Sequence, residues 1–236
     1  QHLPPLMRAS QQPATAAPAG RPWRFRARTA RACLALGLVA GLAACSINPR
    51  VQLATLDVEP AQLQGIPFHP QTQFQCGPAS LAGVLGASGV EVDPDDLAPQ
   101  VYLPGREGSL QVELLGATRR AGRIPYVIDR EPDAIAAELA AGRPVLVMQN
   151  LRTPGFPVWH YAVVVGQDRA SNRVVLNSGT REGMRQRAPS FLRTWDWAQR
   201  WGMVALRPGE LPASADPLRY AEAVAAFEAV AGGAAA

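Results

Sequence analysis

The sequence contains 236 residues, of which 47% are hydrophobic and 18% charged, so it can form one domain with a tail and is not a disordered chain. The formal net charge is +4, but six of the 23 basic residues precede residue 45, where there is no acidic residue. From residue 45 onward 17 basic residues face 19 acidic ones, a balance of −2, which excludes the positive surface typical of nucleic-acid-binding proteins. All basic residues are arginines, so a phosphate-binding P-loop, which requires lysine, is excluded and we predict no nucleotide partner.

The N-terminal segment has the features of an export signal. Residues 21–31 are rich in arginine, and residues 32–44 form an uncharged stretch of 13 residues. As a helix this stretch would span about 20 Å, too short for the roughly 30 Å hydrocarbon core of a bilayer. A short apolar stretch behind basic residues is typical of a signal peptide, the alternative being a short buried helix. We predict that residues 1–44 are an upstream extension followed by a signal peptide.

Residues 42–45, Leu-Ala-Ala-Cys, resemble a bacterial lipobox. The resemblance implies cleavage before Cys45 and attachment of lipid to its thiol. Ser46, the next residue, implies sorting to the outer membrane. We therefore predict an exported bacterial lipoprotein on the periplasmic face of the outer membrane. Its lipid would hold it to the membrane, with residues 45–63 as a tether.

Cysteine usage singles out one thiol. Cys33 lies in the predicted signal peptide and Cys45 is the predicted lipidation site, so Cys76 is the only free thiol expected in the mature protein. Exported proteins usually pair or avoid thiols, so an unpaired cysteine suggests a chemical role, the alternative being a small buried residue. One cysteine and two histidines without an H-E-x-x-H motif do not make a zinc site, and we predict neither a metal nor a cofactor.

Cys76 is predicted to stand at the start of a helix. Pro78 suits the first helical turn, and Leu81, Val84 and Leu85 recur at helical spacing. The unsatisfied N–H groups and the dipole at such a helix start favour the thiolate, which is the nucleophilic form. A side-chain amide just upstream could stabilise an oxyanion together with the Cys76 N–H. The candidates for that amide are Gln71, Gln73 and Gln75.

The middle of the chain is predicted to alternate between helices and strands. We expect a helix to begin within residues 92–97, and a second helix to run from 108 to near 122. A short strand over 126–128, a helix over 133–141 and a buried strand over 144–149 should follow. Helices in the first half, followed by an antiparallel sheet built from the second half, predict an α+β domain.

The candidate general bases are His69 and His160, because a cysteine nucleophile needs an imidazole to accept its proton. His160 lies in a predicted strand over 157–166, whereas His69 lies in an extended lead-in. A hairpin folded about residues 168–169 would place His160 nearly opposite Asn177, whose side chain could orient the ring. The alternatives are that His160 is a satisfied core histidine and that Asn177 is a turn residue.

Near the end of the domain, Trp195, Trp197 and Trp201 fit core packing better than a substrate groove. Farther on, residues 216–227 have the pattern of one amphipathic helix, which resembles the first helix of a tetratricopeptide repeat. A single repeat helix cannot bury its apolar face alone. We therefore expect residues 209–236 to be a linker and a helix that either docks a protein partner or is a remnant of a repeat.

Gln71, the run Cys76-Gly77-Pro78-Ala79-Ser80-Leu81 and the downstream His160 resemble the bacteriocin-processing, double-glycine-leader cysteine peptidases, family thirty-nine of the cysteine peptidases. The resemblance covers about residues 64–208. It implies a papain-like fold, with an N-terminal helical half that carries Cys76 and a C-terminal antiparallel sheet that carries His160. It also implies that Gln71 lines the oxyanion hole and that Asn177 fills the orienting position. The chain departs from the family in the spacing from Gln71 to Cys76, five residues instead of six, and in having Asn-Ser where Asp-Pro is common.

These features predict a cysteine peptidase that acts on a peptide or protein substrate. Cys76 would attack the carbonyl, His160 would protonate the leaving amine, and Gln71 would stabilise the oxyanion. Members of the family are often fused to export ATPases, and we predict a lipoprotein variant without such a transporter domain. The alternatives are a non-catalytic peptide-binding or scaffolding lipoprotein on the same fold, and an enzyme that transfers the acyl group with the same cysteine and histidine.

Overall fold

The computed structural model describes residues 62–71 and 75–234. The predicted extension, signal peptide and lipidated Cys45 lie outside the described residues, as do Gln73 and most of the predicted tether. None of the helices in the described part of the chain is long and apolar enough to cross a bilayer.

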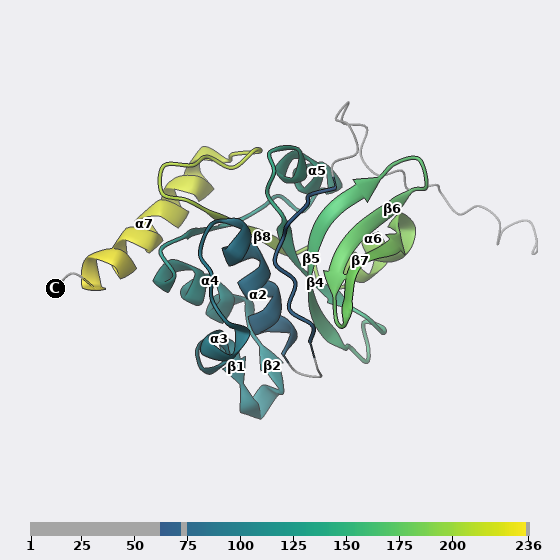
Figure 1. The fold of residues 1–236 in the computed structure, drawn as a ribbon, viewed down its shortest axis with the longest axis horizontal. Helices are drawn as coiled ribbons and strands as arrows, with labels where there is room; N and C mark the ends of the chain where they lie inside the picture. The colour runs from purple at the N-terminus through teal and green to yellow at the C-terminus, as the bar shows by residue number, and fades with distance from the viewer. Residues whose placement is uncertain (1–61, 72–74, 235–236) are drawn as a thin grey trace, which may run out of the picture. The chain divides into compact units, whose positions relative to one another are not determined.

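A six-stranded antiparallel sheet with helices on both faces forms the centre of the domain (Figure 1). The strand order is β3-β8-β4-β5-β6-β7. The strands are β3 (Ile124–Val127), β4 (Val145–Asn150), β5 (Trp159–Asp168), β6 (Arg173–Ser178), β7 (Arg181–Arg187) and β8 (Gly202–Leu206). A separate two-stranded ladder joins β1 (Tyr102–Leu103) to β2 (Gly108–Ser109). The prediction of an α+β domain with an antiparallel sheet in its second half is confirmed.

Helices cover the two faces of this sheet and divide the core into two clusters. The helices are α2 (Cys76–Ala87), α3 (Pro94–Val101), α4 (Gln111–Arg120), α5 (Pro132–Ala140), α6 (Ala188–Asp196) and α7 (Pro217–Ala234), with a 3-10 turn at Pro104–Arg106. Successive side chains of a strand point to opposite faces, so in β4 Val145 and Val147 pack with α5 and α6, whereas Leu146 packs with α2, α3 and α4. Helix α2 therefore lies on one face of the sheet, with α6 on the other.

The start of α4 differs from its prediction. The helix was expected from residue 108, but Gly108 and Ser109 pair with Leu103 and Tyr102 in the small ladder, and α4 begins at Gln111. The ladder matters for the site because it carries Ser109 against the first turn of α2: a Cβ added at Gly77 would lie 2.2 Å from Ser109 Oγ. Only glycine fits at that position of the helix while Ser109 keeps its place.

The C-terminal helix α7 buries part of its surface on its own domain. Tyr220, Val224 and Phe227 pack against the cluster that contains α5 and α6, and the Tyr220 ring lies 6.4 Å from the ring of Tyr126. The Tyr220 hydroxyl also donates a hydrogen bond to the Glu210 carbonyl, at 3.0 Å. The helix thus has a partner for its apolar side within the chain, without further repeats.

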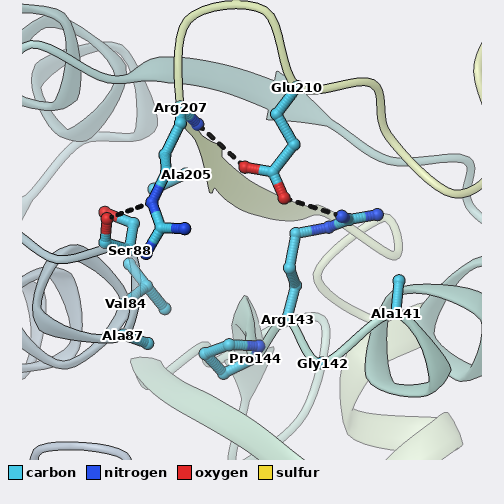
Figure 2. Close-up of a pocket in the computed structure, with 10 residues that line it drawn as sticks. All are labelled: Val84, Ala87, Ser88, Ala141, Gly142, Arg143, Pro144, Ala205, Arg207 and Glu210. Carbon is cyan, nitrogen blue, oxygen red and sulfur yellow. Dashed lines mark hydrogen bonds and ion pairs between the residues drawn. The ribbon is translucent and has the colours of Figure 1, made fainter.

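The C-terminal end of α2 borders a polar cavity of about 210 Å³, whose charged groups are paired (Figure 2). The Ser88 carbonyl accepts hydrogen bonds from Arg123 Nη2 at 2.9 Å and Arg207 Nε at 3.0 Å, which caps the helix with two cations at its negative end. Arg143 contacts the fully buried Glu138 at 2.6 Å and Glu210 at 2.9 Å. Two arginines therefore hold this end of the helix, and the ion pairs of Arg143 lie across the same cavity.

Candidate active site

Cys76 is the first residue of α2, as the sequence predicts. Gln75 precedes it as the N-cap residue and makes no side-chain capping hydrogen bond to the helix. The residues from Gly77 to Leu85 are all buried, so the helix is fixed tightly against the sheet while Cys76 stays half-buried at its end. The thiol is therefore both anchored and accessible.

Burial raises the pKa of the Cys76 thiol, and hydrogen bonds from the backbone N–H groups of Tyr161, Gly77 and Cys76 itself counteract this rise only in part. The N–H groups at the helix start act in the predicted direction, since those of Gly77 and Cys76 lower the pKa of the thiol. Desolvation by the surrounding elements outweighs the donors that the helix start supplies. The contact with the Tyr161 N–H also places the sulfur beside the backbone of the residue that follows His160.

His160 lies near the start of β5 and lines the same cleft as Cys76, a cavity of about 930 Å³. Its Nε2 atom is 2.9 Å from Ser178 Oγ. Burial lowers the pKa of the ring, so the neutral imidazole is favoured. In the described part of the chain no hydrogen bond joins the thiol to the ring, and burial disfavours the charged form of each group.

Asn177 does not lie opposite His160. The register of β5 and β6 pairs Val163 with Asn177, three residues from the predicted partner, because the turn is centred later and the pairing shifts between Val164 and Gly166. The Asn177 Oδ1 atom accepts a hydrogen bond from the Gly183 N–H, at 3.0 Å. The predicted pairing is therefore wrong, and the residue that contacts the ring is Ser178, which the sequence analysis missed.

Gln71 is buried and lines the cleft beside Cys76. Its backbone N–H donates to the Gly179 carbonyl at 3.0 Å, and its Nε2 lies 3.4 Å from Ser80 Oγ. Its Oε1 atom is buried and has no hydrogen-bond partner. The structure thus brings Gln71, Cys76 and His160 to one cleft.

A second buried polar atom without a partner, Ser109 Oγ, also belongs to a residue of the cleft. Most buried hydroxyls in folded proteins are hydrogen-bonded, so two unpaired oxygens around one helix start are unusual. Ser109 is held in place from its backbone, because its carbonyl accepts a hydrogen bond from the Tyr161 hydroxyl at 3.2 Å. Sequence reasoning missed Ser109 because it was assigned to a helix.

The other candidates lie elsewhere. His69 stands in the extended segment before Gln71 and is not among the described residues that line the cleft, and Gln75 is exposed. Trp195 is fully buried, as the core-packing interpretation predicts. Trp201 packs edge-on to Tyr161, with ring centroids 6.0 Å apart.

The cleft has an apolar rim on the side of the β4–β5 connection. Leu151, Val158 and Trp159 line it and expose 47%, 42% and 52% of their surface, and Leu110 contributes from the loop before α4. Such a rim suits the side chains of an extended peptide laid beside the thiol. Within residues 62–71 and 75–234 there is no group of three acidic, histidine or cysteine side chains that could hold a metal ion.

Comparison with known proteins identifies the family. The model of the Peptidase_C39 like family matches residues 63–202, more than half of the chain. The chain belongs to this Peptidase_C39 like family. The family resemblance inferred from Gln71, Cys76 and His160 is thereby confirmed, and family and fold together are those of cysteine peptidases. No curated protein matches this C39-like chain.

Three solved structures are similar to the C39-like domain. A C39-like peptidase from Bacillus anthracis superposes with a TM-score of 0.51 at 16% identity, over 63% of this chain and 98% of that one. A double-glycine-motif protease of an AMS/PCAT transporter, solved with its leader peptide, has a TM-score of 0.48 and 19% identity over 63% and 97% of the two chains. The peptidase domain of Streptococcus ComA, a bifunctional ABC transporter, has a TM-score of 0.49 and 18% identity over 60% and 98%. The family match and the superposition on the Bacillus anthracis structure confirm the papain-like α+β fold.

Proposed function

We propose that this chain is a cysteine peptidase in which Cys76 is the nucleophile and His160 the general base. One observation carries the proposal: Cys76 at the start of α2 and His160 near the start of β5 line a single cleft. A cysteine and a histidine supplied to one cleft by a helix start and a strand form the pair that nucleophilic catalysis requires.

The path of the proton depends on which nitrogen of the His160 ring is free to accept it. Nε2 is held by Ser178, so Nδ1 accepts the thiol proton as the sulfur attacks the substrate carbonyl. The imidazolium then protonates the leaving amine while the carbonyl re-forms as a thioester on Cys76. Water attacks the thioester, loses a proton to His160 and releases the acid, and the imidazolium returns that proton to the sulfur. Burial disfavours the charged form of each group, so we propose that the ion pair forms as the sulfur attacks the substrate.

Gln71 is proposed as the side-chain donor of the oxyanion hole. The amide has two orientations related by a half-turn. In one of them Oε1 accepts the Ser80 hydroxyl proton, and the NH2 group takes the place of the buried oxygen that has no partner. That NH2 group and the Cys76 N–H would then both be available to a developing oxyanion.

The proposal can be tested by incubating the full chain with a mixture of peptides of varied sequence. Mass spectrometry then detects the cleavage products. Cys76→Ala should abolish cleavage, and His160→Ala should reduce it by at least about a hundredfold, the lower range of general-base effects. His69→Ala is the matched control, because His69 is the other histidine of the mature chain and should leave cleavage unchanged. Full activity of Cys76→Ala would end the proposal.

A non-catalytic peptide-binding protein is the second candidate. The observations that favour it are the raised pKa of Cys76, the lowered pKa of His160, and a neutral serine on the ring where a carboxylate would stabilise the imidazolium. Saturable peptide binding without turnover at any pH would support this candidate over the peptidase. Acyl transfer is a further outcome, recognised by products in which an added amine replaces water.

We also propose that the protein is exported and carries a lipid on Cys45. The basic segment, the uncharged stretch of 13 residues and the Leu-Ala-Ala-Cys ending at Cys45 support a lipoprotein on the periplasmic face of the outer membrane, where the substrate peptides would be met. Labelled palmitate should enter the wild-type chain and not Cys45→Ala. Labelling of both chains, or of neither, would contradict lipidation at Cys45.

A further inference from the structure

Ser178, the last residue of β6, and Gly179, which follows it, contact two residues that the proposed chemistry needs. Ser178 Oγ lies 2.9 Å from Nε2 of His160, and the next residue, Gly179, accepts a hydrogen bond at 3.0 Å from the backbone N–H of Gln71. Gly179 has a positive φ of +59°, which glycine adopts without strain, so the chain turns there directly after Ser178. One tight turn therefore fixes the ring and the segment that carries the oxyanion donor.

From this geometry we propose that Ser178 is the positioning residue of His160, an inference that rests on the proposed function. A neutral imidazole carries one proton, and the nitrogen that faces the thiol must be the one without it. When Ser178 Oγ accepts a hydrogen bond from Nε2–H, Nδ1 is left as the acceptor. After the thiol proton arrives, Nε2–H still donates to Ser178, so the contact persists through the reaction.

Asn177 cannot share this role in the structure. Its amide oxygen is engaged with the Gly183 N–H at 3.0 Å, and it pairs with Val163 rather than with a residue at the start of β5. Ser178 is buried, with 9% of its surface exposed, so water competes weakly for its hydroxyl. The orienting group of this chain is therefore a hydroxyl one residue farther along than the sequence comparison implies.

The Ser178 hydroxyl affects the pKa of the His160 ring differently from a carboxylate in the same place. It carries no charge, so it fixes the tautomer without stabilising the imidazolium by Coulomb attraction. Burial is accordingly the cause of the shift in the pKa of His160, and its direction is downward. Ser178 thus gives an oriented base that is harder to protonate than one paired with aspartate.

The experiment compares Ser178→Ala, Ser178→Thr and Ser178→Asp with the wild type in the full chain. Ser178→Ala should lower kcat/KM about tenfold, the worth of one hydrogen bond, and Ser178→Thr should restore it. Ser178→Asp should move the acidic limb of the pH–rate profile to higher pH. Ser171→Ala, a serine at the other end of the β5–β6 hairpin, is the control and should match the wild type.

A second measurement does not depend on activity. Nitrogen NMR of the His160 ring should show the Nε2–H tautomer in the wild type, a mixture of tautomers in Ser178→Ala and a raised pKa in Ser178→Asp. A wild-type tautomer and pKa in all three Ser178 variants would overturn the positioning role, even if Cys76→Ala abolishes cleavage. Conversely, the tautomer or pKa of the His160 ring could change in the Ser178 variants while the wild-type protein cleaves no peptide. That result would overturn the proposed function and uphold the contact between Ser178 and His160.

Discussion

The two ends of helix α2 satisfy their polar groups to very different degrees. At the C-terminal end, Figure 2 shows the contacts of Ser88 with Arg207 and of Arg143 with Glu210. Arg123 also caps Ser88, and Arg143 also pairs with Glu138. At the N-terminal end, the helix has no side-chain cap, and two buried oxygens, Gln71 Oε1 and Ser109 Oγ, have no partner.

This difference suggests that the C-terminal end of α2 serves stability and that its N-terminal end serves function. A buried polar atom without a partner costs about 1 to 3 kcal/mol, so a protein keeps such atoms where a ligand or reaction intermediate can use them. Paired ions and capped carbonyls have no such use and hold the helix in place. We therefore expect the loss of a paired group at the C-terminal end to lower stability without changing reactivity, and the removal of an unpaired hydroxyl at the N-terminal end to leave stability unchanged or raise it.

The largest effect on stability is expected from Arg143→Ala at the C-terminal end. The change leaves the fully buried Glu138 without its ion-pair partner, which should cost about 3 to 5 kcal/mol in the free energy of unfolding. Urea denaturation measures the loss, and iodoacetamide labelling of the folded fraction should show unchanged Cys76 reactivity. The control is Arg185→Ala, which breaks the exposed pair with Asp168 and should cost less than about 1 kcal/mol. Equal losses in the two variants would contradict the comparison.

The next effect is expected from Gly77→Ala at the N-terminal end. The added Cβ would lie 2.2 Å from Ser109 Oγ and 2.6 Å from Ser109 Cβ, so the clash should cost about 1 to 3 kcal/mol. Helix propensity alone would give the opposite sign, a gain of up to about 1 kcal/mol. That gain is expected in the control Gly116→Ala in α4, where the nearest atom, 3.3 Å away, is the end of the Arg120 side chain. Adding Ser109→Gly to Gly77→Ala should recover most of the loss, and failure to recover it would mean that the clash lies elsewhere.

A third effect concerns pH and His160. Burial lowers the pKa of the folded ring from the value of about 6.5 expected in the unfolded chain. Between these two values the unfolded chain binds a proton and the folded chain does not, so the free energy of unfolding should fall as the pH falls below about 6.5. His160→Gln should weaken this dependence, and His69→Gln should preserve it. An identical pH dependence of unfolding in the His160→Gln protein would contradict the buried neutral ring.

The smallest effect, and one of opposite sign, is expected from Ser109→Ala. Removing a buried hydroxyl that has no partner should leave stability unchanged or raise it by about 1 kcal/mol. The matched change at the other end is Ser88→Ala, which removes a hydroxyl that donates to Leu85 at 2.7 Å and accepts from Arg123 at 3.1 Å, and should cost about 1 kcal/mol. Thermal unfolding of Ser109→Ala and Ser88→Ala compares their stabilities. A loss of stability in both variants would contradict the difference between the two ends of the helix.

The sequence by itself determined which groups could do chemistry. A single thiol expected after the signal peptide, a proline two residues later and apolar residues at helical spacing placed Cys76 at a helix start, and a β-rich run placed His160 in a strand. These inferences depend on composition and local periodicity, which the sequence carries directly. Strand β7 has neither, because its residues alternate without an apolar face, and it was not predicted.

Only the tertiary structure decided how those groups meet. The β5–β6 turn is centred later than predicted and the pairing shifts between Val164 and Gly166, so Asn177 pairs with Val163 and Ser178 contacts His160. The register of a hairpin and an irregularity of this kind leave no clear local signal in the sequence. The raised pKa of Cys76 has the same origin. The N–H donors at the helix start are local, but the desolvation that outweighs them is summed over elements far apart in the chain.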